Sequence, residues 1–151
     1  MEMGLNLPPF EAKIRELNRS KQIFDPIRKK YVALTPEEWV RQHFINLMVV
    51  YKDYPAGLLN VEYPVTINSM QQRVDIVAFN KFGAPVLVVE CKAPTVKLTN
   101  STYAQAARYN LTLRANYLMV TNGMSHFCSR VDFETKSISP LKDIPNFREI
   151  L

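Results

Sequence analysis

The sequence contains few of the residues that build nucleotide and zinc sites. Its four glycines stand far apart, so neither a GxxxxGK[ST] phosphate loop nor a GxGxxG dinucleotide motif is present. The possible zinc ligands, His43, Cys91, His126 and Cys128, are scattered, whereas a structural zinc takes about four ligands at close spacing. These absences exclude a P-loop ATPase and the usual dinucleotide fold, and they argue against a zinc finger.

Long hydrophobic runs are also absent. The best candidate, INLMVVY at residues 45–51, ends at Lys52 and Asp53 and is far shorter than the roughly 18 apolar residues that suggest a membrane span. The opening residues, MEMGLNLPPF, lack the basic and apolar regions of a signal peptide. We therefore expect a cytoplasmic protein with no membrane partner, whose two cysteines are reduced thiols.

The composition is that of one ordinary globular domain. The chain has 151 residues, of which 47% are hydrophobic and 22% charged, enough for a single hydrophobic core. Lysine and arginine number 19 against 14 acids, a net charge of +5. That charge suits a polyanion such as nucleic acid, although many soluble domains share it.

Residue patterns predict a mixed α/β domain with two helices. Thr35, Pro36 and Glu38 match a capping box that opens a helix over residues 36–52, and a second helix is expected over 99–113. The predicted extended segments are residues 10–15, 22–24, 61–67, 74–80, 85–92, 117–121 and 125–133. This order predicts one sheet with both helices packed on it.

The same patterns divide the single domain, residues 1–151, into three parts. Residues 1–34 form an N-terminal hairpin segment, in which the basic run 28–30 is expected to be a solvated turn. Residues 35–133 form the core that carries the site. Residues 134–151 are expected to be an irregular tail, because Pro145 breaks any continuing element.

Charges interrupt two otherwise apolar predicted strands. Asp75 lies within VDIVAFN, and Glu90 and Lys92 end PVLVVECK. If residues 82–83 form a two-residue hairpin turn, Asp75 lies opposite Glu90 and Arg73 opposite Lys92, with opposed Cβ atoms about 5 Å apart. Two carboxylates at that distance repel each other, and a divalent cation with hard oxygen ligands, Mg²⁺ or Mn²⁺, relieves the repulsion. The simpler interpretation is a charge cluster at a sheet edge that serves solubility.

Asp75 followed by Glu90-Cys91-Lys92 resembles the core motif of the PD-(D/E)xK nucleases. The chain is most similar to the domain that opens type I restriction enzyme R subunits. The matching segments are TPEEWVRQ (35–42), RVDIV (73–77), VVECKAP (88–94), QAARYN (105–110) and YLMVTNG (117–123). Val74 replaces the proline before the aspartate, and the helicase motor of those subunits is missing from this chain. The resemblance implies a restriction endonuclease-like fold, a mixed β-sheet flanked by helices.

The resemblance also implies metal-dependent hydrolysis of DNA. Asp75 and Glu90 would hold Mg²⁺ or Mn²⁺ together with the backbone carbonyl of Cys91, whose side chain would point to the opposite face. Lys92 would orient the attacking water or stabilise charge that develops on the phosphate.

Two helices are expected to add residues to this site. Gln105 and Tyr109 fit a QxxxY element and share one helix face; Gln105 would approach the water or the lysine, and Tyr109 a phosphate or base. An ordinary amphipathic helix is the simpler interpretation. Glu37 and Glu38 compete as the acid of the first helix, and Glu37 is favoured because Glu38 is used in the capping box.

The remaining predictions concern partners. Arg73, Lys97, Arg108 and Tyr109 are the expected DNA contacts. Other restriction subunits or a helicase motor on another chain are expected partners, and a homodimer is also compatible with the sequence. Two further functions stay open: a non-catalytic nucleic-acid-binding module of the same fold, and an interaction domain that retains only a charged cluster.

Overall fold

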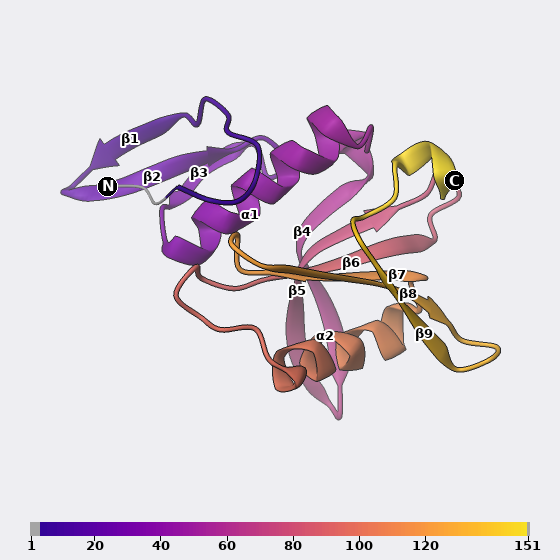
Figure 1. Cartoon of the computed structure of the whole chain (residues 1–151). Helices are drawn as coiled ribbons and strands as arrows, with labels where there is room; N and C mark the ends of the chain where they lie inside the picture. Colours follow the sequence, from indigo (N-terminus) through magenta and orange to yellow (C-terminus); the bar gives the residue numbers. More distant parts are fainter. Residues whose placement is uncertain (1–3, 151) are drawn as a thin grey trace.

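The protein, described here by a computed structural model over residues 4–150, contains two sheets and two α-helices (Figure 1). The helices are α1 (Pro36–Asn46), which continues into a π-helical turn (Leu47–Tyr51), and α2 (Asn100–Leu113). The strands are β1 (Ile14–Leu17), β2 (Ser20–Asp25), β3 (Lys30–Ala33), β4 (Leu59–Ile67), β5 (Met70–Phe79), β6 (Pro85–Cys91), β7 (Tyr117–Thr121), β8 (His126–Asp132) and β9 (Ser137–Leu141). The outermost residues of the predicted N-terminal segment and tail, 1–3 and 151, lie outside the described residues.

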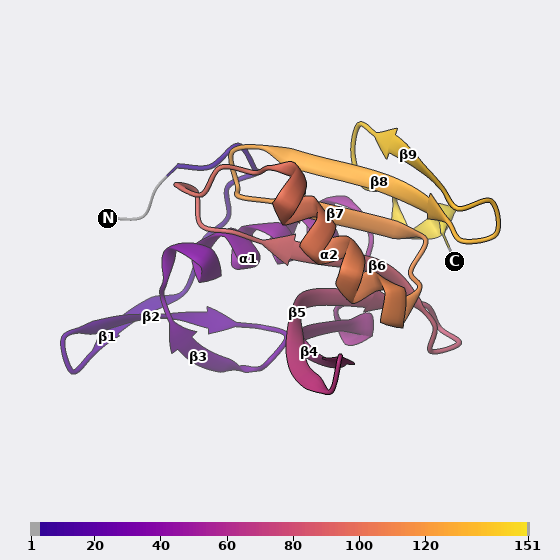
Figure 2. The same ribbon diagram turned by 90° about the horizontal axis from the view of Figure 1, so that it is seen from below.

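Strands β4 to β9 form a six-stranded mixed sheet in sequence order, in which β6 and β7 run parallel. Helix α1 packs on one face, where Val40, Phe44 and Met48 join a cluster with Ile76 and Val89. Helix α2 covers the other face through a second cluster with residues of β5 to β7 (Figure 2). The mixed α/β class and the sheet between two helices are therefore confirmed. No helix within residues 4–150 is long and apolar enough to cross a membrane.

The first three strands form a separate antiparallel sheet, which corrects the prediction of one sheet. The third of them, β3, begins at Lys30 and is not predicted, because a basic run is typical of a solvated turn. Arg28 in that run is instead largely covered and makes ion pairs with Asp25 and Glu38. All four residues of β1 are exposed. The small sheet therefore has no second apolar face, which it would need if it were part of the main sheet and covered on both sides.

The β5–β6 hairpin has the predicted register but a different turn. Its ladder pairs Ile76 with Val89, which makes 75 and 90 the next opposed positions. The connection is a three-residue loop at 81–83, closed by a backbone hydrogen bond between residues 80 and 84, rather than a two-residue turn at 82–83. A bulge after Ala78 shifts the register by one position, and this shift compensates for the extra loop residue.

Beyond Ile76 the two strands separate. Arg73 lies opposite Pro64 of β4, and the backbone N–H of Lys92 donates to the carbonyl of Thr121 in β7 at 2.8 Å. The β5–β6 ladder ends at Ile76 and Val89, so the predicted pairing of Arg73 with Lys92 is wrong.

The C-terminal segment is ordered and contributes to the core, which corrects the prediction of an irregular tail. Strand β9 pairs with β8 along its whole length. Ile144, Phe147 and Ile150 then turn back into the cluster beneath α1. The sequence does not predict β9 because this strand contains Pro140 and is exposed at four of its five positions, so it shows no apolar alternation.

Candidate active site

Asp75 and Glu90 are joined by a crossed pair of hydrogen bonds between neighbouring strands. The carboxylate oxygen Oδ2 of Asp75 accepts from the backbone N–H of Cys91 at 2.7 Å, and Oε1 of Glu90 accepts from the backbone N–H of Asp75 at 3.2 Å. Their chain neighbours Ile76, Val89 and Cys91 pack beneath α1, and the Asp75 carboxylate contacts Arg41 of that same helix. Burial of the Cys91 side chain in the core agrees with the sequence expectation.

Both carboxyl groups are poorly solvated. The side chain of Asp75 is 14% exposed and Glu90 is 5% exposed. Burial raises the pKa of Asp75, although the Cys91 N–H and the charge of Arg41 oppose the rise. Burial also raises the pKa of Glu90, and the neighbouring charge of Asp75 raises it further. Like-charge proximity alone predicts a raised pKa at this pair; the direction is as expected, but loss of solvent is the larger cause.

Two cations lie near this carboxylate pair. Arg41 of α1 brings its Nη1 to 3.3 Å from Oδ1 of Asp75. The charge of Lys92 lowers the pKa of both Asp75 and Glu90, yet within residues 4–150 no acidic oxygen lies within 4 Å of its ammonium group. Lys92 is thus close enough to act electrostatically on the pair and is not held by it.

The structure separates the two acids of helix α1. Glu37 is exposed, and its charge raises the pKa of both Asp75 and Glu90, so it lies within electrostatic range of the pair. Glu38 is buried; its backbone N–H donates to Thr35 Oγ1 at 3.0 Å, as a helix cap requires. The Glu38 carboxylate, however, binds Arg41 at 2.6 and 3.0 Å, and Arg28 at 2.7 Å. Glu38 therefore belongs to an internal ion network, and Glu37 stays the favoured candidate for the site acid.

Sequence reasoning does not reveal this network. Arg28 of the β2–β3 turn bridges Glu38 and Asp25, and Arg41 bridges Glu38 and Asp75. The pairing of Arg28 with an acid ten positions away depends on how β1–β3 pack against α1, which local spacing does not encode. The network as a whole connects the small sheet to Asp75 through three consecutive ion pairs, Arg28–Glu38, Glu38–Arg41 and Arg41–Asp75.

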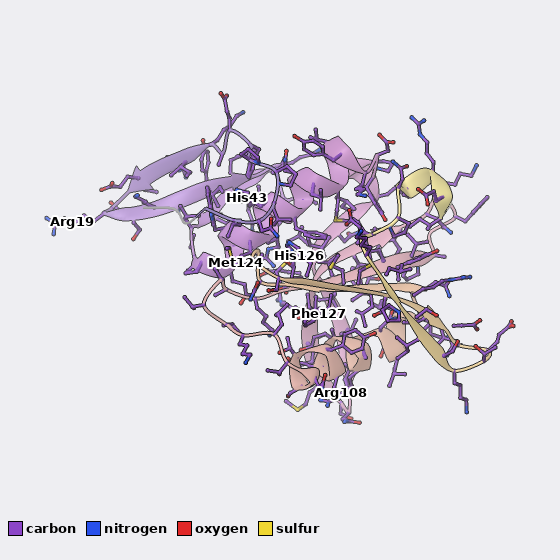
Figure 3. All side chains as sticks on the ribbon, viewed as in Figure 1. Arg19, His43, Arg108, Met124, His126 and Phe127 are labelled. Atoms are coloured by element: carbon purple, nitrogen blue, oxygen red, sulfur yellow. The ribbon has the colours of Figure 1, made fainter. Side chains whose placement is uncertain are left out.

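The predicted QxxxY residues lie together on α2. Gln105 Nε2 donates to the hydroxyl of Tyr109 at 3.1 Å. With Arg108 they line a hollow of about 180 Å³ between α2 and the tip of the β4–β5 hairpin. Arg108 is labelled at α2 in Figure 3, and Asp75, Glu90 and Lys92 are not among the residues that line the hollow.

The other expected DNA contacts are also at the surface. Arg73 is 70% exposed and lies 3.6 Å from Glu62, while Lys97 is exposed in the connection between β6 and α2. The two histidines are occupied by hydrogen bonds: Nδ1 of His43 bonds the Trp39 carbonyl at 2.8 Å, and Nδ1 of His126 bonds Thr121 Oγ1 at 2.7 Å.

The donor chemistry of the site fits a hard divalent cation. Among residues 4–150, no three His, Cys, Asp or Glu side chains gather as a ready-made metal cage. Two carboxylates and a backbone carbonyl nevertheless suit Mg²⁺, which binds through one or two carboxylates and keeps several waters. The Cys91 thiol lies on the opposite face, and burial raises its pKa well above the ordinary value, which argues against a thiolate-ligated metal.

Comparisons with known proteins agree with this architecture. The pattern of the family "Type I restriction enzyme R protein N terminus" matches residues 36–145. A solved fragment, assigned as an HsdR subunit of a type I restriction enzyme from Vibrio vulnificus YJ016, superposes with a TM-score of 0.56 at 19% identity. The match covers 78% of this chain and 24% of that one, so this chain spans about a quarter of that protein. No curated protein sequence matches.

Proposed function

Because the chain belongs to the family of type I restriction enzyme R protein N-terminal domains, we propose that it is a metal-dependent DNA endonuclease domain of the PD-(D/E)xK type. The observation that carries the proposal is the crossed Asp75–Glu90 pair. Two buried carboxylates side by side destabilise the folded protein unless a positive charge compensates them. A shared cation would supply that compensation.

In this proposal each residue of the site has a role that follows from its position. Asp75, Glu90 and the Cys91 carbonyl hold Mg²⁺ or Mn²⁺, which when bound supplies an activated water and offsets charge on the phosphate. Lys92, whose ammonium has no ion-pair partner within residues 4–150, orients that water or stabilises the developing charge. Arg41 keeps the Asp75 carboxylate ionised and oriented through its 3.3 Å contact. Glu37 adds negative charge beside the same site.

A cleavage assay tests the proposal. The parent protein is incubated with linear, circular and single-stranded DNA in Mg²⁺ or Mn²⁺, with chelator controls. Glu90→Gln is the matched inactive variant, because it keeps the size of the side chain and the acceptor for the Asp75 N–H. We expect metal-dependent cleavage by the parent and none by Glu90→Gln; cleavage of equal rate by both proteins contradicts the assignment.

The second candidate is a non-catalytic nucleic-acid-binding module. It is favoured by the contact of Arg41 with Asp75, which compensates part of the buried charge without any metal. In that case DNA binding is insensitive to chelators and no substrate is cut under any metal condition. If the protein has no affinity for DNA at all, an interaction domain is favoured instead.

Partners follow from the family. We propose that DNA is the substrate and that other restriction-system subunits or a helicase motor act together with this domain, as its family suggests. A cytoplasmic location and a homodimer stay predictions; light scattering of the purified chain tests the second.

A further inference from the structure

The positive charge of the protein is concentrated in the small N-terminal sheet. Residues 13–33 contain seven of the 19 lysines and arginines and two of the 14 acids. Twelve residues of each sign are left for the rest of the chain, which is therefore neutral. The net charge of +5 thus belongs to β1, β2, β3 and their turns.

This sheet projects from the main body of the protein (Figure 1). It precedes residues 36–145, the range that matches the family pattern. Six of its seven cations have exposed side chains, and Arg19 lies at the outer tip in Figure 3. The exposed cations are Lys13, Arg15, Arg19, Lys21, Lys29 and Lys30.

One face of the sheet interleaves cations with aromatic rings. Phe24 and Tyr31 are cross-strand partners with ring centroids 5.3 Å apart. Lys13 lies over the ring of Phe24 at 5.5 Å, and Arg15 over that of Tyr31 at 4.0 Å. Basic groups beside flat aromatic surfaces are the combination with which proteins bind nucleic-acid backbones and bases.

Two of these cations occupy left-handed backbone positions. Asn18 and Arg19 form the β1–β2 turn with φ of 52° and 66°, and Lys29 in the β2–β3 turn has φ of 57°. Glycine or asparagine adopts this conformation more easily than a long basic side chain does. The sequence places charge at the exposed turns despite this local disadvantage.

The sheet also adjoins the candidate active site. A hollow of about 570 Å³ lies between them; it is lined from the small sheet by Arg28, Val32 and Ala33, and from the site side by Glu37 and Arg41. Arg28 ties the two walls together through its ion pair with Glu38 at 2.7 Å. The small sheet therefore borders a hollow whose other wall includes Arg41, the residue that contacts Asp75.

From these observations we propose that β1–β3 form a DNA-binding arm, which holds the phosphate backbone beside the carboxylate pair. The arm rests on the proposed function, because it supplies substrate affinity to that same site. Its cations contact phosphates without reading sequence, and its two rings offer a stacking surface to unpaired bases.

The test compares two triple variants of equal charge in the full chain. Arg19→Gln/Lys29→Gln/Lys30→Gln removes three cations from the arm, and Lys81→Gln/Lys136→Gln/Lys142→Gln removes three exposed cations elsewhere. Binding of duplex and single-stranded DNA is measured in chelator over a range of salt, with circular dichroism as the check of folding. We expect the arm variant alone to weaken binding and to lower the salt slope on duplex DNA by about 0.9 for each phosphate that it no longer neutralises.

The outcomes separate the arm from the endonuclease proposal. Equal, small losses in both triple variants overturn the arm while cleavage by the parent leaves the endonuclease assignment standing. A parent protein that binds no DNA overturns both. If the triple variant is misfolded, Arg19→Gln alone at the tip decides, because an unchanged salt slope in that variant also overturns the arm.

Discussion

At the scale of single residues, the site depends on the different positions of Lys92 and Asp75. Lys92 lies near the carboxylates without being bound to them, whereas Asp75 accepts hydrogen bonds from Cys91 and Arg41. A group that contributes only in the transition state lowers the rate when removed, and a ligand lowers metal affinity. The two residues should therefore fail in different ways when replaced.

We expect Lys92→Ala to abolish cleavage while leaving the melting temperature and Mn²⁺ affinity near the parental values, because an ammonium group is not a metal ligand. Asp75→Ala should lose Mn²⁺ affinity, since it removes an oxygen ligand. Single-turnover cleavage and Mn²⁺ titration of both variants beside the parent measure these effects. Parental cleavage by Lys92→Ala would show that its catalytic assignment is wrong.

Glu38 makes the free energy of unfolding depend on pH. Burial would raise its pKa, but the hydrogen bonds and charges of Arg41 and Arg28 lower it to about 2. The unfolded chain, with an ordinary value of about 4.3, then binds more protons than the folded protein between these two values. Stability from Glu38 is therefore present above about pH 4.3 and is lost as the pH falls toward 2.

Glu38→Gln should accordingly be less stable than the parent at pH 7, and the difference should shrink on acidification. The neutral-pH loss is on the order of 3 kcal/mol, from about 1.4 kcal/mol per unit of pKa shift. Urea denaturation at pH 7 and near pH 3 measures it. A difference that is the same at both pH values would mean that the ion pairs of Glu38 do not cause it.

The carboxylate pair can be predicted from the sequence, but its surroundings cannot. Asp75 and Glu90 stand out because a charge inside an apolar strand is conspicuous and hairpin pairing is local. The ion network through Arg28 escapes prediction, since arginine in a basic run next to a turn looks solvated until the chain places it beside Glu38. Gln105 bonds Tyr109, a contact that a four-residue spacing on a helix favours, and its approach to the water or to Lys92 stays a prediction.

At the scale of elements, strong local signals predict structure well and weak ones do not. Helix α2 and strand β7 lie within a residue of their predicted ends, since each has a cap or a continuous apolar run. The β5–β6 register is correct although its turn is not: the three-residue loop and the bulge after Ala78 offset each other. Strand β9 has neither alternation nor an apolar run, so local pattern alone does not reveal it.

The segment that follows β9 packs into the hydrophobic core through Phe147, and a substitution tests this role. Phe147 is 7% exposed and its ring lies 5.4 Å from that of Tyr54. Phe147→Ala should lower the free energy of unfolding by about 3–5 kcal/mol, because it leaves a cavity in the core. Ile138→Ala in β9, where the side chain is 55% exposed, is the control and should change it little. Urea denaturation that gives equal midpoints for the two variants would contradict the packing role.

At the scale of the whole molecule, the folded unit extends beyond the family match on both sides. Asn6 at the N-terminal side donates its backbone N–H to the carbonyl of Gly123 at 2.8 Å, and its own carbonyl bonds His126 at 3.0 Å. Leu5 and Leu7 pack against the cluster beneath α1. The predicted core of 35–133 therefore does not contain all the contacts that complete the hydrophobic core.

A chain cut to residues 36–145 should consequently be much less stable than the full chain, although it retains the carboxylate pair. The cut removes Arg28 and so leaves part of the Glu38 charge uncompensated, which costs more than the loss of an exposed pair. It also removes Phe147 and Ile150, each worth about 1.5–3 kcal/mol when fully buried. Urea denaturation of the shortened and full chains at pH 7 measures the loss, with Mn²⁺ omitted so that binding does not contribute. Equal unfolding midpoints would show that residues 36–145 fold on their own and that the flanking segments only attach to a finished core.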